Sequence, residues 1–148
     1  MSNGYTMSHM EWLAYWGYSN SIVRPDQFHV LLYDDEVDEL TAQSDIEDIT
    51  SEPESGNYER ATLAFPADTK ITVNEHYVQI DPVTAVFDFA GVTETVSHAG
   101  VVWEAELQGD EERRDHLMVR NELDERMDLT RIRGRYEVEV PWQLHPLF

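Results

Sequence analysis

The stretch Tyr136-Glu137-Val138-Glu139-Val140 decides the fold class of this chain. Aromatic and aliphatic residues occupy every second position, and glutamates occupy the positions between them. Because the side chains of a β-strand point alternately to opposite faces, this pattern places the apolar side chains on one face and the acids on the other. The stretch therefore predicts a half-buried β-strand.

Segments of similar character recur about every ten residues before this strand. They are rich in β-branched and aromatic residues and are separated by turn-forming sequences such as Asp81-Pro82. No helical periodicity alternates with them, which argues against an α/β fold. We expect an all-β fold, a β-sandwich of jelly-roll-like type, as a single domain over residues 1–148. The expected strands are residues 27–33, 60–65, 70–73, 76–80, 85–89, 94–106, 116–122 and 131–140.

An N-terminal helical segment is expected within residues 1–20, with the helix over 8–18. Ser8 followed three residues later by Glu11 fits the capping-box pattern. An apolar face is expected from Met10, Leu13 and Ala14, with Trp12, Tyr15 and Trp16 around it. Two interpretations stay open: the helix caps the end of the β core, or it docks on a neighbouring subunit.

Two further segments do not read as regular strands. Residues 34–56 alternate acidic with isolated apolar residues, contain Pro53, and predict a long solvent-exposed acidic loop with at most one helical turn at 44–49. Residues 141–148 form an apolar C-terminal tail, which is unusual for a frayed end. We therefore expect the tail to dock on another surface.

The charge balance is the most informative property of the composition. The chain carries 30 acidic against 10 basic residues, a formal net charge of −20, and Lys70 is its only lysine. Such a surface repels itself at low ionic strength but is screened in molar salt, where the Debye length falls to about 3 Å. Lysine avoidance with surplus carboxylate resembles the proteins of salt-adapted archaea. The alternative is an acidic protein of another kind, such as a solvating or DNA-mimicking one.

Several partners and compartments are disfavoured. Direct binding to nucleic acid is not expected, because that affinity comes largely from Lys and Arg on phosphates. The absence of cysteine excludes disulfides and thiolate chemistry. No apolar run reaches the roughly 20 residues of a membrane span, and no export signal is recognisable. We expect no membrane association.

Catalytic motifs are also lacking, so we do not expect an enzyme. The six histidines show no HExxH spacing, and we interpret them as packed or solvent-facing residues rather than metal ligands. The acidic run at 34–39 lacks the glycine and the spacing of an EF-hand loop, although loose cation binding stays open. No serine lies in a G-x-S-x-G elbow, and no glycine-rich phosphate loop is present. We predict no catalytic residue, no metal and no cofactor.

Four pieces of the chain resemble a family of short virion proteins of tailed viruses, of the tail-fibre, minor-tail or capsid-associated type. The pieces are residues 28–33, 56–65, 85–89 and 94–102. The chain departs from the family where a charged turn at 109–114 replaces the usual glycine-rich ending, and its final strands are longer. The resemblance implies a β-sandwich subunit in a symmetric oligomer, without cofactor or catalysis.

The expected function is therefore that of a structural protein of a tailed virus infecting a halophilic archaeon. It would act as a tail, baseplate, collar or capsid-decoration subunit, assembled in the host cytoplasm with copies of itself and other virion proteins. The alternative is a stand-alone halophilic β-sandwich module that recognises carbohydrate or protein. The assembly interface is expected at Trp12, Tyr15, Trp16, Trp142, Leu144, Leu147 and Phe148.

Overall fold

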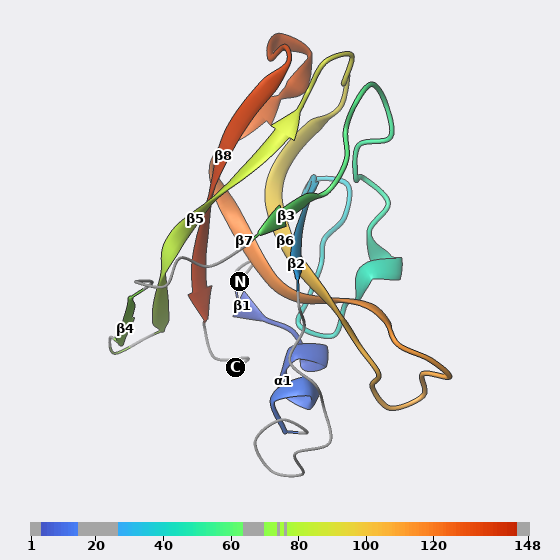
Figure 1. Cartoon of the computed structure of the whole chain (residues 1–148), viewed down its shortest axis with the longest axis vertical. Helices are drawn as coiled ribbons and strands as arrows, with labels where there is room; N and C mark the ends of the chain where they lie inside the picture. Colours follow the sequence, from blue (N-terminus) through green and yellow to red (C-terminus); the bar gives the residue numbers. More distant parts are fainter. Residues whose placement is uncertain (1–3, 15–26, 64–69, 74, 76, 145–148) are drawn as a thin grey trace.

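The computed structural model describes residues 4–14, 27–63, 70–73, 75 and 77–144. Residues 141–144 are described by their backbone alone. The elements are β1 (Gly4–Tyr5), α1 (Met7–Ala14), β2 (Phe28–Tyr33), η2 (Ile46–Asp48), β3 (Ala61–Leu63), β4 (Ile71–Val73), β5 (Val78–Asp88), β6 (Thr95–Ala105), β7 (Arg114–Asp128), η3 (Leu129–Arg131) and β8 (Arg135–Leu144). The strands form two antiparallel sheets, of order β1-β7-β6-β2-β3 and β4-β5-β8 (Figure 1). The predicted all-β, sandwich-like fold is confirmed.

The core lies between the two sheets. Leu32 and Val101 of the larger sheet join Phe87 and Val140 of the smaller sheet in one buried cluster. In the smaller sheet the buried residues occupy alternate positions, Val83, Ala85 and Phe87 in β5 and Val138 and Val140 in β8, as the sequence pattern predicts. Burial of this apolar surface is the main force that holds the two sheets together.

Strand β5 joins two segments that were expected to be separate strands. Asp81-Pro82 does not make the expected turn, because β5 runs through it with a register shift between Ile80 and Val83 opposite β8. Proline has no backbone N–H, and a bulge accommodates it without loss of a ladder hydrogen bond. The charged turn expected before Arg114 is confirmed, since Ala105 pairs with Arg114 where β6 and β7 meet.

Residues 34–56, the acidic segment, are not solvent-exposed throughout, and this expectation was wrong. Leu40 is buried, and Ile46 and Ile49 pack with it on the outer face of the larger sheet. The sheet contributes Leu31, Tyr33, Val102 and Leu117 to this second apolar cluster. Isolated apolar residues among many acids were enough to anchor the segment. The larger sheet is therefore covered on both faces.

The N-terminal segment begins with a strand rather than a helix, since β1 pairs with β7. Helix α1 is capped by Thr6 instead of Ser8: the Thr6 hydroxyl accepts the backbone N–H of His9 at 3.2 Å. Ser8 donates to Asp45 Oδ2 at 3.1 Å. The predicted positions 15–18 lie outside the described residues.

The C-terminal tail expected over 141–148 is in part a strand. Strand β8 continues to Leu144, and residues 142 and 144 pair with Ile80 and Val78 of β5. Tertiary pairing thus extends the strand past Pro141, whose place in an antiparallel ladder was not evident from the sequence. Residues 145–148 lie outside the part described.

Candidate functional site

The residues predicted for assembly are only partly described. The ring of Trp12 lies 5.4 Å from that of Trp103 in an edge arrangement and packs against the core, so it belongs to the fold of its own chain. The backbone of residues 142 and 144 lies in β8, and their side chains are not described. Tyr15, Trp16, Leu147 and Phe148 lie outside the described residues. Of the predicted set, the structure describes the side chain of Trp12, and it packs that ring against the core of its own chain.

Helix α1 turns a different face to the core than expected. His9 and Trp12 face inward, whereas Met7, Met10 and Leu13 are between 42% and 48% exposed. The three exposed residues are spaced at i, i+3 and i+6 and form one apolar stripe. The helix thus caps the core with its aromatic side and presents an apolar side to solvent.

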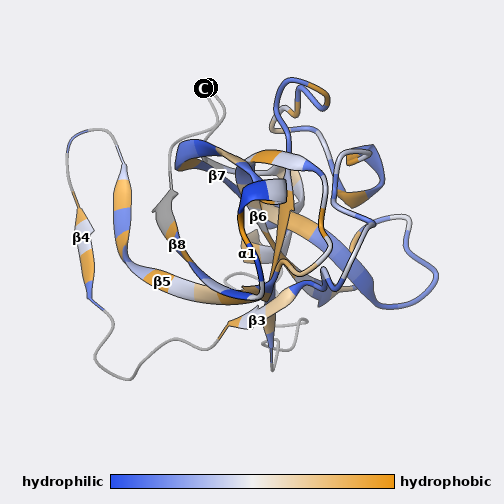
Figure 2. Ribbon diagram, turned by 90° about the horizontal axis from the view of Figure 1, so that it is seen from above, coloured by the Kyte–Doolittle hydropathy of each residue, from blue (hydrophilic) through white to orange (hydrophobic). Residues whose placement is uncertain are grey.

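A second exposed apolar surface lies on the hairpin of β4 and β5. Ile71 and Val73 are 67% and 73% exposed, and they pair with Ile80 and Val78 across the hairpin. Directly opposed residues point to the same face of a sheet, so these four residues form one apolar surface, the hairpin patch. Strand β4 lies at the edge of the molecule in two orthogonal views (Figures 1 and 2). The sequence predicted this strand but not its exposure, because I-T-V also suits a buried strand.

Under the acidic segment, carboxylates are matched with donors rather than free. Asp34 accepts two hydrogen bonds from Arg126, Nη1 to Oδ1 at 2.8 Å and Nη2 to Oδ2 at 2.7 Å. Asp38 accepts from the backbone N–H groups of Thr50 and Ser51 at 2.9 and 2.7 Å. Burial by itself raises the pKa of Asp38, but hydrogen bonds from the hydroxyls of Ser51 and Thr50, together with these backbone N–H bonds, hold it below its usual value. The carboxylates of Asp34 and Asp38 thus anchor the acidic segment through hydrogen bonds and do not form an open cation site.

The most constrained titratable group is His116 of β7. Its Nδ1 lies 2.6 Å from Asp45 Oδ2 and its Nε2 lies 2.7 Å from Asp110 Oδ2, and its side chain is 3% exposed. Burial by itself lowers the pKa of His116, but the hydrogen bonds to both carboxylates outweigh this and raise it. Both nitrogens are occupied, so His116 has none left to bind a metal or abstract a proton. Residues 45, 110 and 116 are far apart in sequence, and no local pattern signalled their meeting.

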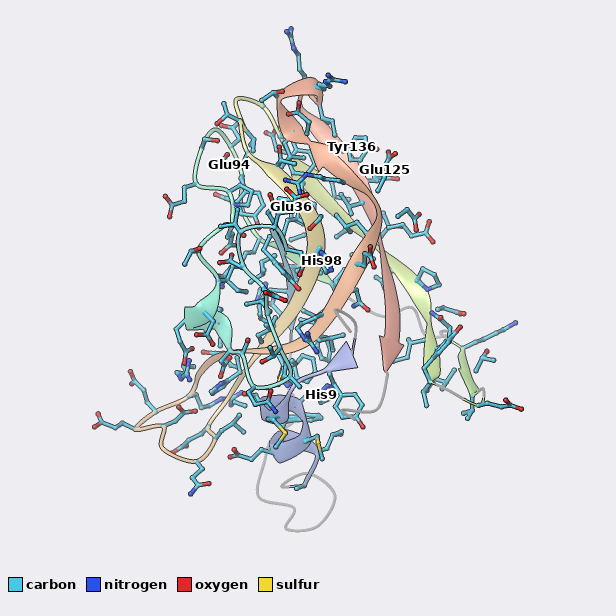
Figure 3. The ribbon with its side chains drawn as sticks, turned by 180° about the vertical axis from the view of Figure 1, so that it is seen from behind. His9, Glu36, Glu94, His98, Glu125 and Tyr136 are labelled. Carbon is cyan, nitrogen blue, oxygen red and sulfur yellow. The ribbon has the colours of Figure 1, made fainter. Side chains whose placement is uncertain are left out.

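Two other histidines are buried, and their burial lowers the pKa of each. His9 of α1 is labelled in Figure 3. Its ring packs beside that of Trp103, with the ring centroids 5.1 Å apart. Burial lowers its pKa to about 4, against a small rise from its hydrogen bond to the Met118 carbonyl. The pKa of His98 is also lowered, mainly by burial. Within the described ranges no group of three or more His, Asp or Glu residues is placed to hold a metal ion.

One shallow groove lies between β3 and β5. It has a volume of about 430 Å³ and is lined by polar and charged residues, among them Asn57, Arg60 and Arg135, together with the apolar residues Ala61, Val86 and Phe87. Arg60 is already bonded to Glu52, Nε to Oε2 at 2.9 Å and Nη2 to Oε1 at 2.8 Å. The guanidinium of Arg60 is therefore already paired with a carboxylate of its own chain.

Comparisons with known proteins found no matching family model, no matching curated protein and no matching solved structure. Among the helices described, none is long and apolar enough to cross a membrane. The class that fold and site define is an acidic, two-sheet β protein with a partly uncovered apolar surface.

Proposed function

We propose that this chain is a structural subunit of a tailed virus that infects a halophilic archaeon, in a tail, baseplate, collar or capsid-decoration layer. It acts by binding copies of itself and other virion proteins, and it has no catalytic role. The halophilic host is supported by the net charge of −20 with a single lysine. The virion setting is supported by the resemblance of four strand-rich pieces to tailed-virus proteins.

Assembly is carried by one observation, the hairpin patch. Ile80 packs against the core cluster, and Ile71 pairs with it on the same face while remaining 67% exposed. The core face of the smaller sheet thus continues beyond the part that its own chain covers. Contiguous exposed apolar surface of this kind marks protein–protein contact sites.

The charge distribution favours a second copy as the occupant of this patch. Two molecules that each carry −20 repel one another through most of their surfaces. Residues 70–80 contain one lysine and one glutamate, Lys70 and Glu75, so this stretch has no net charge with histidine neutral. A symmetric contact that places patch against patch buries apolar area without bringing carboxylates together.

The test is the mass of the protein in solution. We expect multi-angle light scattering in about 1 M salt, where the Debye length is about 3 Å, to give a multiple of the 17.2 kDa chain mass. The double variant Ile71→Glu/Val73→Glu should give the single-chain mass with an unchanged circular dichroism spectrum. The matched control is Val37→Glu, because Val37 is 65% exposed on the acidic segment and should leave the mass unchanged. A single-chain mass for the unaltered protein, or an oligomer that survives the double variant, would overturn the assembly proposal.

A second candidate function is a halophilic binding module for carbohydrate or protein, and the groove beside Arg135 is the observation that favours it. Carbohydrate sites of this kind need exposed aromatic faces. Of the aromatic side chains in the described ranges, Tyr136 alone is exposed, at 41%, and it does not line the groove. Glycan-array binding by a monomeric protein that Arg135→Ala abolishes would favour this candidate over assembly.

A further inference from the structure

We propose that Asp45, His116 and Asp110 form a protonation-dependent latch, which holds the acidic segment closed over the larger sheet and releases it when His116 loses its second ring proton. The three residues come from three parts of the chain: the acidic segment, the turn between β6 and β7, and β7 itself. This device is independent of the assembly proposal.

The geometry by itself requires a charged imidazole. Both ring nitrogens of His116 face carboxylate oxygens at hydrogen-bond distance, 2.6 and 2.7 Å. A neutral imidazole carries one N–H, so its other nitrogen would set a lone pair against a carboxylate. Imidazolium donates to both. Loss of one proton therefore breaks one of the two contacts.

The charged groups around His116 favour the protonated form. Asp45 and Asp110 contact it directly, and the positive charge of Arg114 opposes its protonation. Arg114 bonds Asp110 Oδ1 at 3.0 Å and lies 3.5 Å from Asp45 Oδ2 and 3.3 Å from Glu47. Strand β6 pairs Trp103 with His116, so Glu104 and Asp115, the next pair in the register, point to the opposite face of the sheet. Helix α1 contributes Glu11, which accepts the backbone N–H of Gln108 in the same turn as Asp110. At the ring itself, two carboxylates act against the one guanidinium of Arg114.

The acidic segment is built so that this contact controls its closure. Its base is fastened by Asp38, which accepts from Thr50 and Ser51 and so closes a loop over residues 39–49. Asp45 lies within that loop, and its Oδ1 accepts the backbone N–H of Leu117 at 2.8 Å. The first part of the loop stays attached through the Leu40 carbonyl, which accepts Arg120 Nη1 at 3.1 Å, and the Ala42 carbonyl, which accepts the Met7 N–H at 2.8 Å. Release of Asp45 therefore loosens the part of the loop that follows Ala42.

An apolar surface lies beneath this loop. Leu40, Ile46 and Ile49 cover Leu31, Val102 and Leu117 of the sheet, which are fully buried in the closed state. Opening would expose these side chains to solvent or to a partner. The latch thus controls access to a second apolar face, separate from the hairpin patch.

The sign of the pH dependence follows from the raised pKa of His116. The latch contributes fully below the ordinary histidine value of 6.5 and is lost as pH rises through the raised value. Asp45 and Asp110 have lowered pKa values, about 2 for Asp110, so their contribution persists until strongly acidic pH. Opening is therefore an alkaline event.

The test is amide hydrogen exchange of Leu117, corrected for intrinsic rates, together with ¹⁵N shifts of the His116 ring across a pH series in about 1 M salt, where exposed charges are screened. We expect the His116 ring to titrate above the ordinary histidine value of 6.5, and Leu117 exchange to accelerate about tenfold or more as the ring deprotonates. Exchange of β5 and β8 amides should stay unchanged. The control His29→Gln, at a half-exposed histidine of β2, should behave like the unaltered protein.

Asp45→Asn is the decisive variant. The side-chain amide that this substitution introduces can donate to a neutral His116 Nδ1, while its oxygen keeps the bonds from the Leu117 and Ile46 N–H groups. This variant should remain closed at the alkaline pH that opens the unaltered protein. The proposal fails if His116 titrates at or below 6.5, or if Leu117 exchange ignores its titration. It also fails if Asp45→Asn opens at the same pH as the unaltered chain.

Discussion

The hydroxyl of Tyr58 accepts the backbone N–H of Leu32 at 3.0 Å and donates to Glu52 Oε2 at 2.9 Å. The pairing of β3 with β2 stops at Val30 and Ala61. Beyond that point, Leu32 is the next residue of β2 whose backbone N–H points toward the β3 side. The phenol thus continues the edge of the sheet after β3 has ended. The Tyr58 hydroxyl here accepts the hydrogen bond that a backbone carbonyl of a neighbouring strand accepts elsewhere in the sheet.

Removal of this hydroxyl should destabilise the fold. Tyr58→Phe keeps the ring stacked 5.9 Å from Phe87 but leaves the buried N–H of Leu32 without its acceptor. We expect a loss of about 1–3 kcal/mol in the free energy of unfolding by urea titration. The exposed Tyr136→Phe should change it by less than about 0.5 kcal/mol. Equal stability of the two variants would show that Leu32 finds another partner.

Gly100 is expected to tolerate no side chain. A Cβ at this position would lie 2.7 Å from Leu117 Cδ1 and 3.2 Å from Leu31 Cδ1, and both leucines are fully buried. Gly100→Ala should therefore cost about 1–3 kcal/mol by overpacking. Adding Leu117→Val removes the contacting carbon, so the double variant should lose less than the sum of the single variants. Additive losses would contradict steric conflict as the cause.

The ion pair of Arg126 and Asp34 should depend on guanidinium geometry. Arg126→Lys keeps the charge but cannot bond both oxygens of a carboxylate that is 7% exposed. We expect a loss of about 1 kcal/mol, measured by thermal unfolding in molar salt. Arg131→Lys is the control, because Arg131 is 85% exposed and lies 3.6 Å from Asp128. If both variants lose the same stability, the bidentate contact of Arg126 does not contribute to the stability of the fold.

The stability of the fold should fall in acid, and His9 should account for part of this fall. Its pKa is about 4 in the folded chain against 6.5 for the free side chain, because burial among aromatic rings disfavours the charged form. Its contribution is present above 6.5 and is lost as pH falls towards 4, an effect of about 3 kcal/mol. His9→Phe keeps a ring and should flatten the stability between these pH values. An unchanged pH profile in this variant, with His29→Phe for comparison, would assign the acid sensitivity elsewhere.

Strand positions were the most predictable part of the fold. The strand over Phe28–Tyr33 and the alternation around Val138 were read directly, since the pattern of burial along a strand is local. The errors fell where a distant segment intervened. Pro82 reads as a turn until β8 pairs across its bulge, and Thr6 becomes the helix cap although Ser8 has the better sequence pattern.

The candidate sites were less predictable than the strands. Exposure of Ile71 and Val73 depends on how far the larger sheet extends over the smaller one, which no residue in β4 encodes. Trp12 was predicted as a contact residue because it is aromatic, but its ring packs against the core of its own chain. The same side chain suits either role, and only its neighbours distinguish them.

Residue patterns over a few positions thus established an all-β, strongly acidic chain without thiol chemistry, because alternation, charge and cysteine content are properties of the chain itself. Packing in three dimensions established which acids are fastened, which apolar residues stay uncovered and which histidine is held between two carboxylates. The reason is physical: burial and electrostatic environment are sums over neighbours far away in sequence, such as Asp45 and His116, and they exist only once the chain has folded.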